Sequence, residues 1–149
     1  MKQYKILFIF CLFVGLNTVF GQITPKIGDE YQGGIVAYLN GSGGGLIAMK
    51  TDLGVFRWSD AIKACKNSEL NGFTDWYLPS KMELNLMYIN KDIIGNFNSL
   101  TTPIFQPWYW SSSGNNFASA WAQDFNTGEQ VIFNWRKSDG VLVRAVRAF

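Results

Sequence analysis

The chain has 149 residues, 13 of them basic and 11 acidic, and contains no histidine. This length predicts a single domain. The absence of histidine excludes Ser-His-Asp and Cys-His catalysis and histidine-ligated zinc, and leaves carboxylate chemistry open.

Residues 1–21 have the features of a secretory signal peptide. Lys2 and Lys5 precede an apolar run over residues 6–19, followed by a small residue suited to cleavage. The run is shorter than the roughly 20 residues that a membrane-spanning helix needs. We therefore expect an exported protein, located in the periplasm, on the outer surface or secreted. The domain would cover residues 22–149, with no membrane span after cleavage.

Cleavage would remove two lysines and no acid, which leaves 11 basic and 11 acidic residues and a net charge of zero. Without a basic field, no nucleic-acid partner is expected. Cys65 would be the remaining cysteine, so no intramolecular disulfide is expected. Since no histidine can activate its thiol, we expect Cys65 to be a small buried apolar side chain.

The first half of the domain predicts a hairpin and two helices. Residues 33–39 and 46–50 read as strands joined by a glycine-rich turn. A first helix is expected over residues 59–66, capped by Ser59 or Asp60.

The second helix has a clearer start, because Ser80 and Glu83 are spaced as a capping box. Leu84 and Met87 belong to an apolar stripe that we assign to the core. A long polar loop over residues 90–107 follows, and its length makes it a candidate functional loop.

From residue 108 the apolar period changes to two, which indicates strands. The expected strands cover residues 108–113, 119–125, 129–135 and 141–149. Helices followed by strands predict an α+β fold, with two helices packed on a mainly antiparallel β-sheet.

Several motifs, in order, resemble one family. Residues 71–84 (NGFTDWYLPSKMEL) resemble the G-x-x-D-W-R-L-P-T-x-x-E-L signature of the Lcl C-terminal domain family. This domain ends a bacterial collagen-like adhesin and was formerly a domain of unknown function. Further matches lie at residues 109–113 (YWSSS), 120–128 and 143–147 (VRAVR). The resemblance implies a C-type-lectin-like fold.

The same segment is similar to the formylglycine-generating sulfatase-modifying domain, but the chemistry does not follow. Tyr77 stands where both patterns usually carry arginine, and no cysteine follows Cys65. The calcium-dependent sugar motifs of animal lectins are also missing. We therefore expect no cofactor and no metal.

Candidate ligand contacts are rings and polar groups at loops and strand ends. Exposed rings suit stacking on sugars or contacts with proteins, and a basic pair beside a ring suits a sulfated polysaccharide. Partial burial of the rings at sheet ends is the alternative. The candidates are Trp108, Tyr109, Asn115, Asn116, Trp135, Arg136 and Lys137. Four further tryptophans, Trp58, Trp76, Trp110 and Trp121, are assigned to the core.

Two arginines in the last expected strand call for carboxylate partners. Arginine forms bidentate pairs with carboxylates, so we expect Arg144 and Arg147 to form structural ion pairs with Asp75, Glu83 or Asp124. Because the arginines are three residues apart, a regular strand would give them different partners. The alternative makes the acids a general acid/base pair.

The sequence thus favours a non-catalytic binding or adhesion module. Its ligand would be a glycan, including sulfated polysaccharide, or a surface protein, held by loops between residues 90 and 118. A carboxylate-dependent glycan-acting enzyme and a structural subunit of a cell-surface assembly are the alternatives. The oligomeric state is left open.

Overall fold

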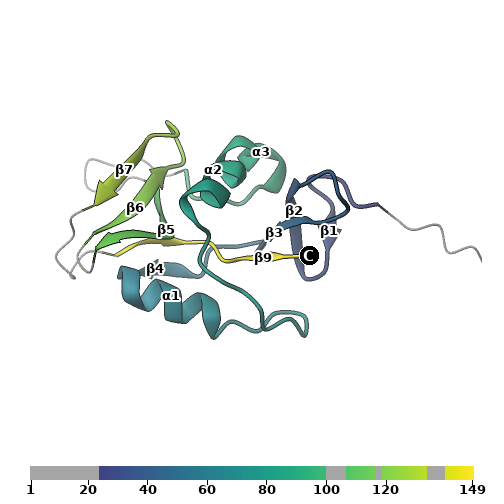
Figure 1. The fold of residues 1–149 in the computed structure, drawn as a ribbon, viewed down its shortest axis with the longest axis horizontal. Helices are drawn as coiled ribbons and strands as arrows, with labels where there is room; N and C mark the ends of the chain where they lie inside the picture. The colour runs from purple at the N-terminus through teal and green to yellow at the C-terminus, as the bar shows by residue number, and fades with distance from the viewer. Residues whose placement is uncertain (1–23, 100–106, 117–118, 134–139) are drawn as a thin grey trace, which may run out of the picture.

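The computed structural model describes residues 24–99, 107–116, 119–133 and 140–149, so the expected signal peptide lies outside it. In these ranges three helices pack against two mainly antiparallel sheets, an α+β arrangement (Figure 1). The strands are β1 Glu30–Tyr31, β2 Gly34–Leu39, β3 Gly45–Ala48, β4 Gly54–Phe56, β5 Trp108–Asn116, β6 Ser119–Asp124, β7 Gln130–Phe133, β8 Val141–Val143 and β9 Val146–Ala148. The helices are α1 Trp58–Lys66, α2 Lys81–Ile89 and α3 Lys91–Ile94.

The four-stranded sheet has the order β1-β2-β3-β9. The predicted hairpin is confirmed, with β2 and β3 antiparallel and Ile35 opposite Ala48. β9 adds antiparallel to β3. The short strand β1 was not predicted, since two residues carry no readable alternation.

The five-stranded sheet has the order β4-β8-β5-β6-β7. β5, β6 and β7 run antiparallel, as predicted, while β8 lies parallel to β5. The prediction of one strand over residues 141–149 is wrong, because the chain leaves the ladder at Arg144 and Ala145 and passes to the other sheet. Residues 141–147 are all buried, so the apolar pattern carried no sign of the change.

Helix α1 begins one residue earlier than predicted, and the expected caps are wrong. The N-cap is Arg57, which makes no side-chain capping bond. Trp58 anchors the start instead, because its Nε1 donates to the Ser111 carbonyl at 2.7 Å. Ser59 and Asp60 therefore lie inside the first turn, where the negative charge of Asp60 interacts favourably with the positive end of the helix dipole.

The capping box of α2 is confirmed. The Ser80 hydroxyl accepts from the Glu83 N–H at 3.3 Å, and the Glu83 carboxylate accepts from the Ser80 N–H at 2.8 Å. Leu84 and Met87 are buried, as expected. The expected loop after α2 is partly wrong, since it contains the short helix α3.

The change Ser80→Ala should lower the free energy of unfolding by about 1 kcal/mol, because the Glu83 N–H loses its acceptor. Urea unfolding measures the loss. Ser59→Ala in α1 is the matched control and should leave the midpoint nearly unchanged, since Ser59 is not the N-cap. Equal midpoints for the two variants would contradict the capping role.

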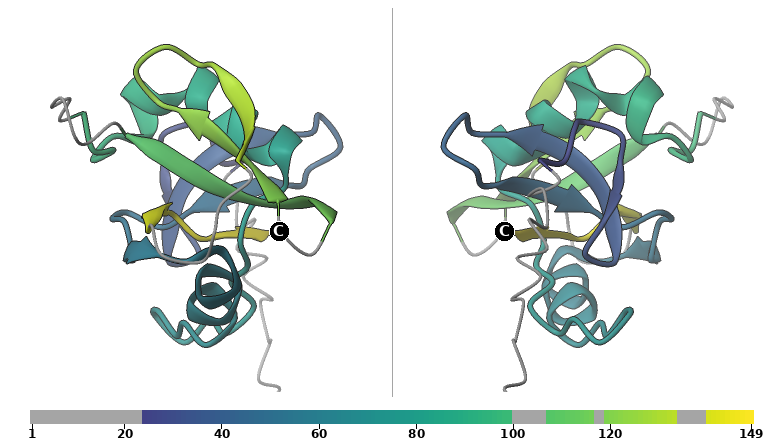
Figure 2. Two further views of the ribbon diagram at one scale, coloured as in Figure 1. Left: turned by 90° about the vertical axis from the view of Figure 1, so that its left-hand side faces the viewer. Right: turned by 90° about the vertical axis from the view of Figure 1, so that its right-hand side faces the viewer.

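The helices lie on opposite sides of the strands, with α2 and α3 on one side and α1 on the other (Figures 1 and 2). Two apolar clusters match this arrangement. One contains Ala61 and Cys65 of α1 with Trp76 and Trp110. The other joins α2 and α3 to strands of both sheets. Of the tryptophans assigned to the core, Trp76 and Trp110 are buried, whereas Trp58 and Trp121 are only partly so.

Cys65 is buried as expected, and burial raises the pKa of its thiol to about 12. We predict that the folded protein reacts negligibly with a disulfide reagent at pH 8 and becomes reactive in urea, measured on a Cys11→Ser chain. An unfolded thiol has a pKa near 8.5. Stability should therefore fall as the pH rises from about 9 toward 12, because the unfolded state loses its proton first. Equal labelling rates with and without urea would contradict the burial.

Candidate functional site

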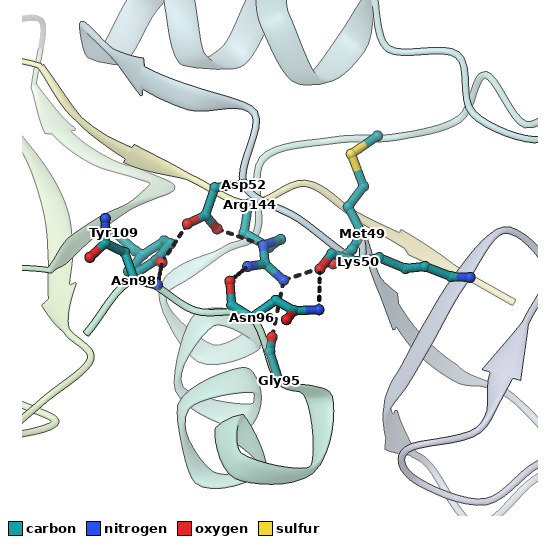
Figure 3. Close-up of polar contacts among 8 residues, drawn as sticks. All are labelled: Met49, Lys50, Asp52, Gly95, Asn96, Asn98, Tyr109 and Arg144. Carbon is teal, nitrogen blue, oxygen red and sulfur yellow. Dashed lines mark hydrogen bonds and ion pairs between the residues drawn. The ribbon is translucent and has the colours of Figure 1, made fainter. Parts of the chain in front are cut away.

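Arg144 lies at the crossing between the two sheets and is only 1% exposed. Its Nε donates to Asp52 Oδ1 at 2.6 Å (Figure 3). Asp52 follows β3 in the sequence and is half-buried, and the two residues are 92 positions apart. The pair therefore connects two segments that are far apart in the sequence.

The other guanidinium nitrogens of Arg144 hold backbone carbonyls. Nη1 donates to the Met49 carbonyl at 2.9 Å and to the Gly95 carbonyl at 3.5 Å. Nη2 donates to the Asn96 carbonyl at 2.6 Å. The guanidinium carbon also lies 4.3 Å from the centre of the Phe97 ring. A buried charge is thus matched by one carboxylate and several dipoles.

Tyr109 completes this group, which we call the Arg144 cluster: Asp52, Tyr109 and Arg144. The Tyr109 hydroxyl donates to Asp52 Oδ2 and accepts from the Asn98 N–H, both at 2.8 Å. Burial and the neighbouring Asp52 carboxylate raise the pKa of Tyr109 above its ordinary value. The phenol therefore stays protonated and acts as a hydrogen-bond donor.

The Arg144 cluster ties together the two ends of the loop that follows α3. Arg144 binds the carbonyls of Gly95 and Asn96 at one end, and Tyr109 in β5 stands at the other end. Gly95 and Asn96 have positive φ angles of 75° and 57°. The cluster thus fixes the base of the loop that the sequence marked as a functional candidate, although residues 100–106 lie outside the described ranges.

Two expectations need correction here. The partner of Arg144 is Asp52 and not an acid from the expected set. Tyr109 is fully buried, so its ring is not the exposed ligand contact that was predicted. Its place at the border of a loop suggested exposure, but its side chain packs against the Phe97 and Phe125 rings, 5.5 and 4.4 Å away between centroids.

Arg147 has the partner that the sequence suggested. Its guanidinium forms a bidentate pair with Asp75 at 2.7 and 2.9 Å and donates to Gln32 Oε1 at 2.7 Å. The carbon of the guanidinium lies 4.0 Å from the centre of the Phe73 ring. Arg147 holds the pKa of the Asp75 carboxyl below its usual range. The two arginines therefore have different partners, as expected.

Glu83 and Asp124 pair with neither arginine, which corrects the expectation for both. Glu83 is the capping carboxylate of α2 and also accepts from the Tyr77 hydroxyl at 2.7 Å. Asp124 Oδ1 accepts from the Asn126 N–H at 2.7 Å and closes the turn into β7. Each carboxylate instead accepts from a backbone N–H group two or three residues away in the sequence.

The remaining predicted ligand contacts are only partly placed. Trp108 is half-buried, and its ring packs edge-on against the Phe133 ring at 4.9 Å between centroids. Asn115 and Asn116 belong to β5, but the positions of their side chains lie outside the description. Trp135, Arg136 and Lys137 fall in residues 134–139, also outside it, and their role stays a prediction.

One surface group was missed by the sequence reasoning, and we call it the Trp121 patch: Lys81, Trp121, Gln130 and Ile132. The Lys81 ammonium lies 3.2 Å from the centre of the Trp121 ring. Gln130 donates to the Lys81 carbonyl at 3.0 Å, and Ile132 stands opposite Trp121 on β7. Trp121 was assigned to the core because it lies in an apolar strand. The alternation along β6 was the available signal, since it places Trp121 and the buried Ala120 on opposite faces.

The described ranges hold no group of three or more His, Cys, Asp or Glu residues placed to bind a metal ion. The same ranges contain no helix long and apolar enough to cross a membrane. The expected absence of a calcium requirement stays a prediction.

The family follows from comparison with known domains. The model of the Lcl C-terminal domain matches residues 40–147. The chain belongs to the Lcl C-terminal domain family. The Lcl C-terminal domain is a domain of adhesin-like proteins. The matched residues include both arginine sites, with Asp52, Asp75, Arg144 and Arg147. No curated protein matches the chain.

Proposed function

We propose that this Lcl C-terminal domain is an exported, non-catalytic adhesion module that binds a glycan, on a C-type-lectin-like variant of the α+β fold. The observation that carries the proposal is the family match over most of the chain. The two-sheet architecture, in which Arg144 and Tyr109 hold the segment directly after α3, is compatible with a scaffold that presents a binding surface.

The carboxylates support binding rather than catalysis. A general acid needs a pKa raised toward neutrality, whereas the pKa of Asp75 is lowered by Arg147. Glu83 and Asp124 are engaged with backbone N–H groups. These contacts give both carboxylates a structural role in the fold.

The Trp121 patch supplies chemistry suited to an acidic glycan in the described part of the chain. Lys81 covers one face of the indole, so the remaining exposed part of the ring offers apolar contact to a sugar, while the ammonium attracts a sulfate or carboxylate group. Lys81 and Trp121 come from different elements, α2 and β6, so the fold brings them together. We therefore place the ligand at the Trp121 patch.

A glycan array probed with the purified protein tests the proposal, with a surface-protein pull-down in parallel. We expect acidic polysaccharides to bind, with at least a tenfold loss for Trp121→Ala and Lys81→Ala. Lys63→Ala on α1 is the matched control, because Lys63 is a highly exposed lysine away from the patch. Binding that is unchanged in the Trp121 and Lys81 variants would move the site elsewhere. Silence on the array and in the pull-down would overturn the binding role.

A further inference from the structure

Residues 95–98, which we call the strap, cross the Arg144 cluster after α3. Their contacts with it are made by side chains of other elements: Arg144 holds two strap carbonyls, and the Tyr109 hydroxyl holds the Asn98 N–H. No backbone–backbone hydrogen bond joins Asn96 or Phe97 to a strand in the described part of the chain. Side-chain hydrogen bonds thus hold the strap, whereas backbone hydrogen bonds to a neighbouring strand hold each strand of the two sheets.

The backbone of the strap is bent and held under constraint. Gly95 and Asn96 both adopt left-handed angles, a conformation that is uncommon for a residue other than glycine. The Asn96 side chain donates to the Lys50 carbonyl at 3.2 Å. The half-buried Phe97 ring fills the space between Phe125, 4.7 Å away between ring centroids, and the Arg144 guanidinium.

The groups beneath the strap keep partners without it. Arg144 retains the Asp52 carboxylate and the Met49 carbonyl, which are not part of the strap. Tyr109 retains its bond to Asp52. Release of the strap would therefore leave the buried ion pair intact and uncover one edge of the guanidinium and the phenol (Figure 3).

We propose that the strap opens and closes as a unit while both sheets stay folded. The hydrogen bonds from Tyr109 and Arg144 to the strap backbone hold it closed. The opening is a local event, since it breaks the strap's hydrogen bonds and the ring contacts of Phe97 but no strand pairing. It exposes one edge of the Arg144 guanidinium and the Tyr109 hydroxyl, which both contact the strap. The proposal stands independently of what the domain binds.

Amide hydrogen exchange on the full chain tests the strap by NMR. In the wild type, we expect the Asn98 amide to exchange at least tenfold faster than Met49 and Leu53. The Met49 and Leu53 amides donate to the Ala145 and Val143 carbonyls, at 2.9 and 2.8 Å. Low urea should accelerate exchange at Met49 and Leu53 far more than at Asn98, because local opening exposes little surface. Exchange of all three amides with one common rate and urea dependence would overturn the proposal.

The change Tyr109→Phe removes the acceptor of the Asn98 N–H and keeps the ring. We expect at least a further tenfold increase in exchange at Asn98 relative to Leu53. Tyr77→Phe is the matched control, because it removes a tyrosine–carboxylate hydrogen bond remote from the strap in sequence and contacts. If Tyr77→Phe raises the exchange rate of Asn98 relative to Leu53 as much as Tyr109→Phe does, Tyr109 does not hold the strap closed and the proposal fails.

Discussion

Replacing Asp52 by asparagine is expected to lower the free energy of unfolding by about 3–5 kcal/mol, because it leaves a buried charge without its partner. Arg144 has a fully buried side chain, and Asp52 is the carboxylate that contacts it. The asparagine oxygen can still accept a hydrogen bond, but it carries no charge. Urea unfolding followed by tryptophan fluorescence measures the loss.

The matched control is Asp75→Asn at the other arginine. The Asp75 side chain is 56% exposed, so water screens this pair, and the buried Arg147 keeps the Gln32 side chain as a partner when the carboxylate is replaced. We expect a loss of about 1 kcal/mol. A loss below about 1 kcal/mol for Asp52→Asn, or equal losses for both variants, would show that the Arg144 pair is not the main ionic contribution to stability.

Replacing Trp110 by alanine is expected to cost about 3–5 kcal/mol, since a buried indole leaves a large cavity. Trp110 lies in the apolar cluster beneath α1, and its Nε1 donates to the Phe56 carbonyl at 2.9 Å. Loss of the ring would also leave that carbonyl without its partner, which adds to the cost.

Trp108→Ala provides the comparison, because Trp108 lies two residues earlier on β5 and is half-buried. It should lose clearly less stability than Trp110→Ala in the same urea titration. If the two variants unfold at the same urea concentration, Trp110 does not contribute more to stability than Trp108, and the prediction is wrong.

Local features of the fold could be predicted from the sequence. The α2 cap depends on Ser80 and Glu83, which are three residues apart and satisfy each other's neighbouring N–H groups. The β2–β3 hairpin likewise needs only alternation and a glycine-rich turn. In contrast, the strand pairing at the end of the chain depends on β4, which was not predicted because its three residues show no pattern.

The candidate site depends on contacts between distant residues, and a single sequence does not show which acid pairs with which arginine. Asp52 is one acid among several in turns, and its pairing with Arg144 arises only when both sheets are assembled. Asp75 and Arg147 could be proposed because a motif limited the choice of acids. Tyr109 was misjudged because the border of a loop does not determine which face of β5 a side chain takes.

The passage of residues 141–148 from one sheet to the other bears on when the protein can fold. β8 lies between β4 and β5, and β9 pairs with β3, so each sheet receives a strand from this short segment. Neither sheet can be completed until the segment has been made. Folding therefore follows synthesis of nearly the whole domain, and its long-range pairings predict slow folding for a domain of this size.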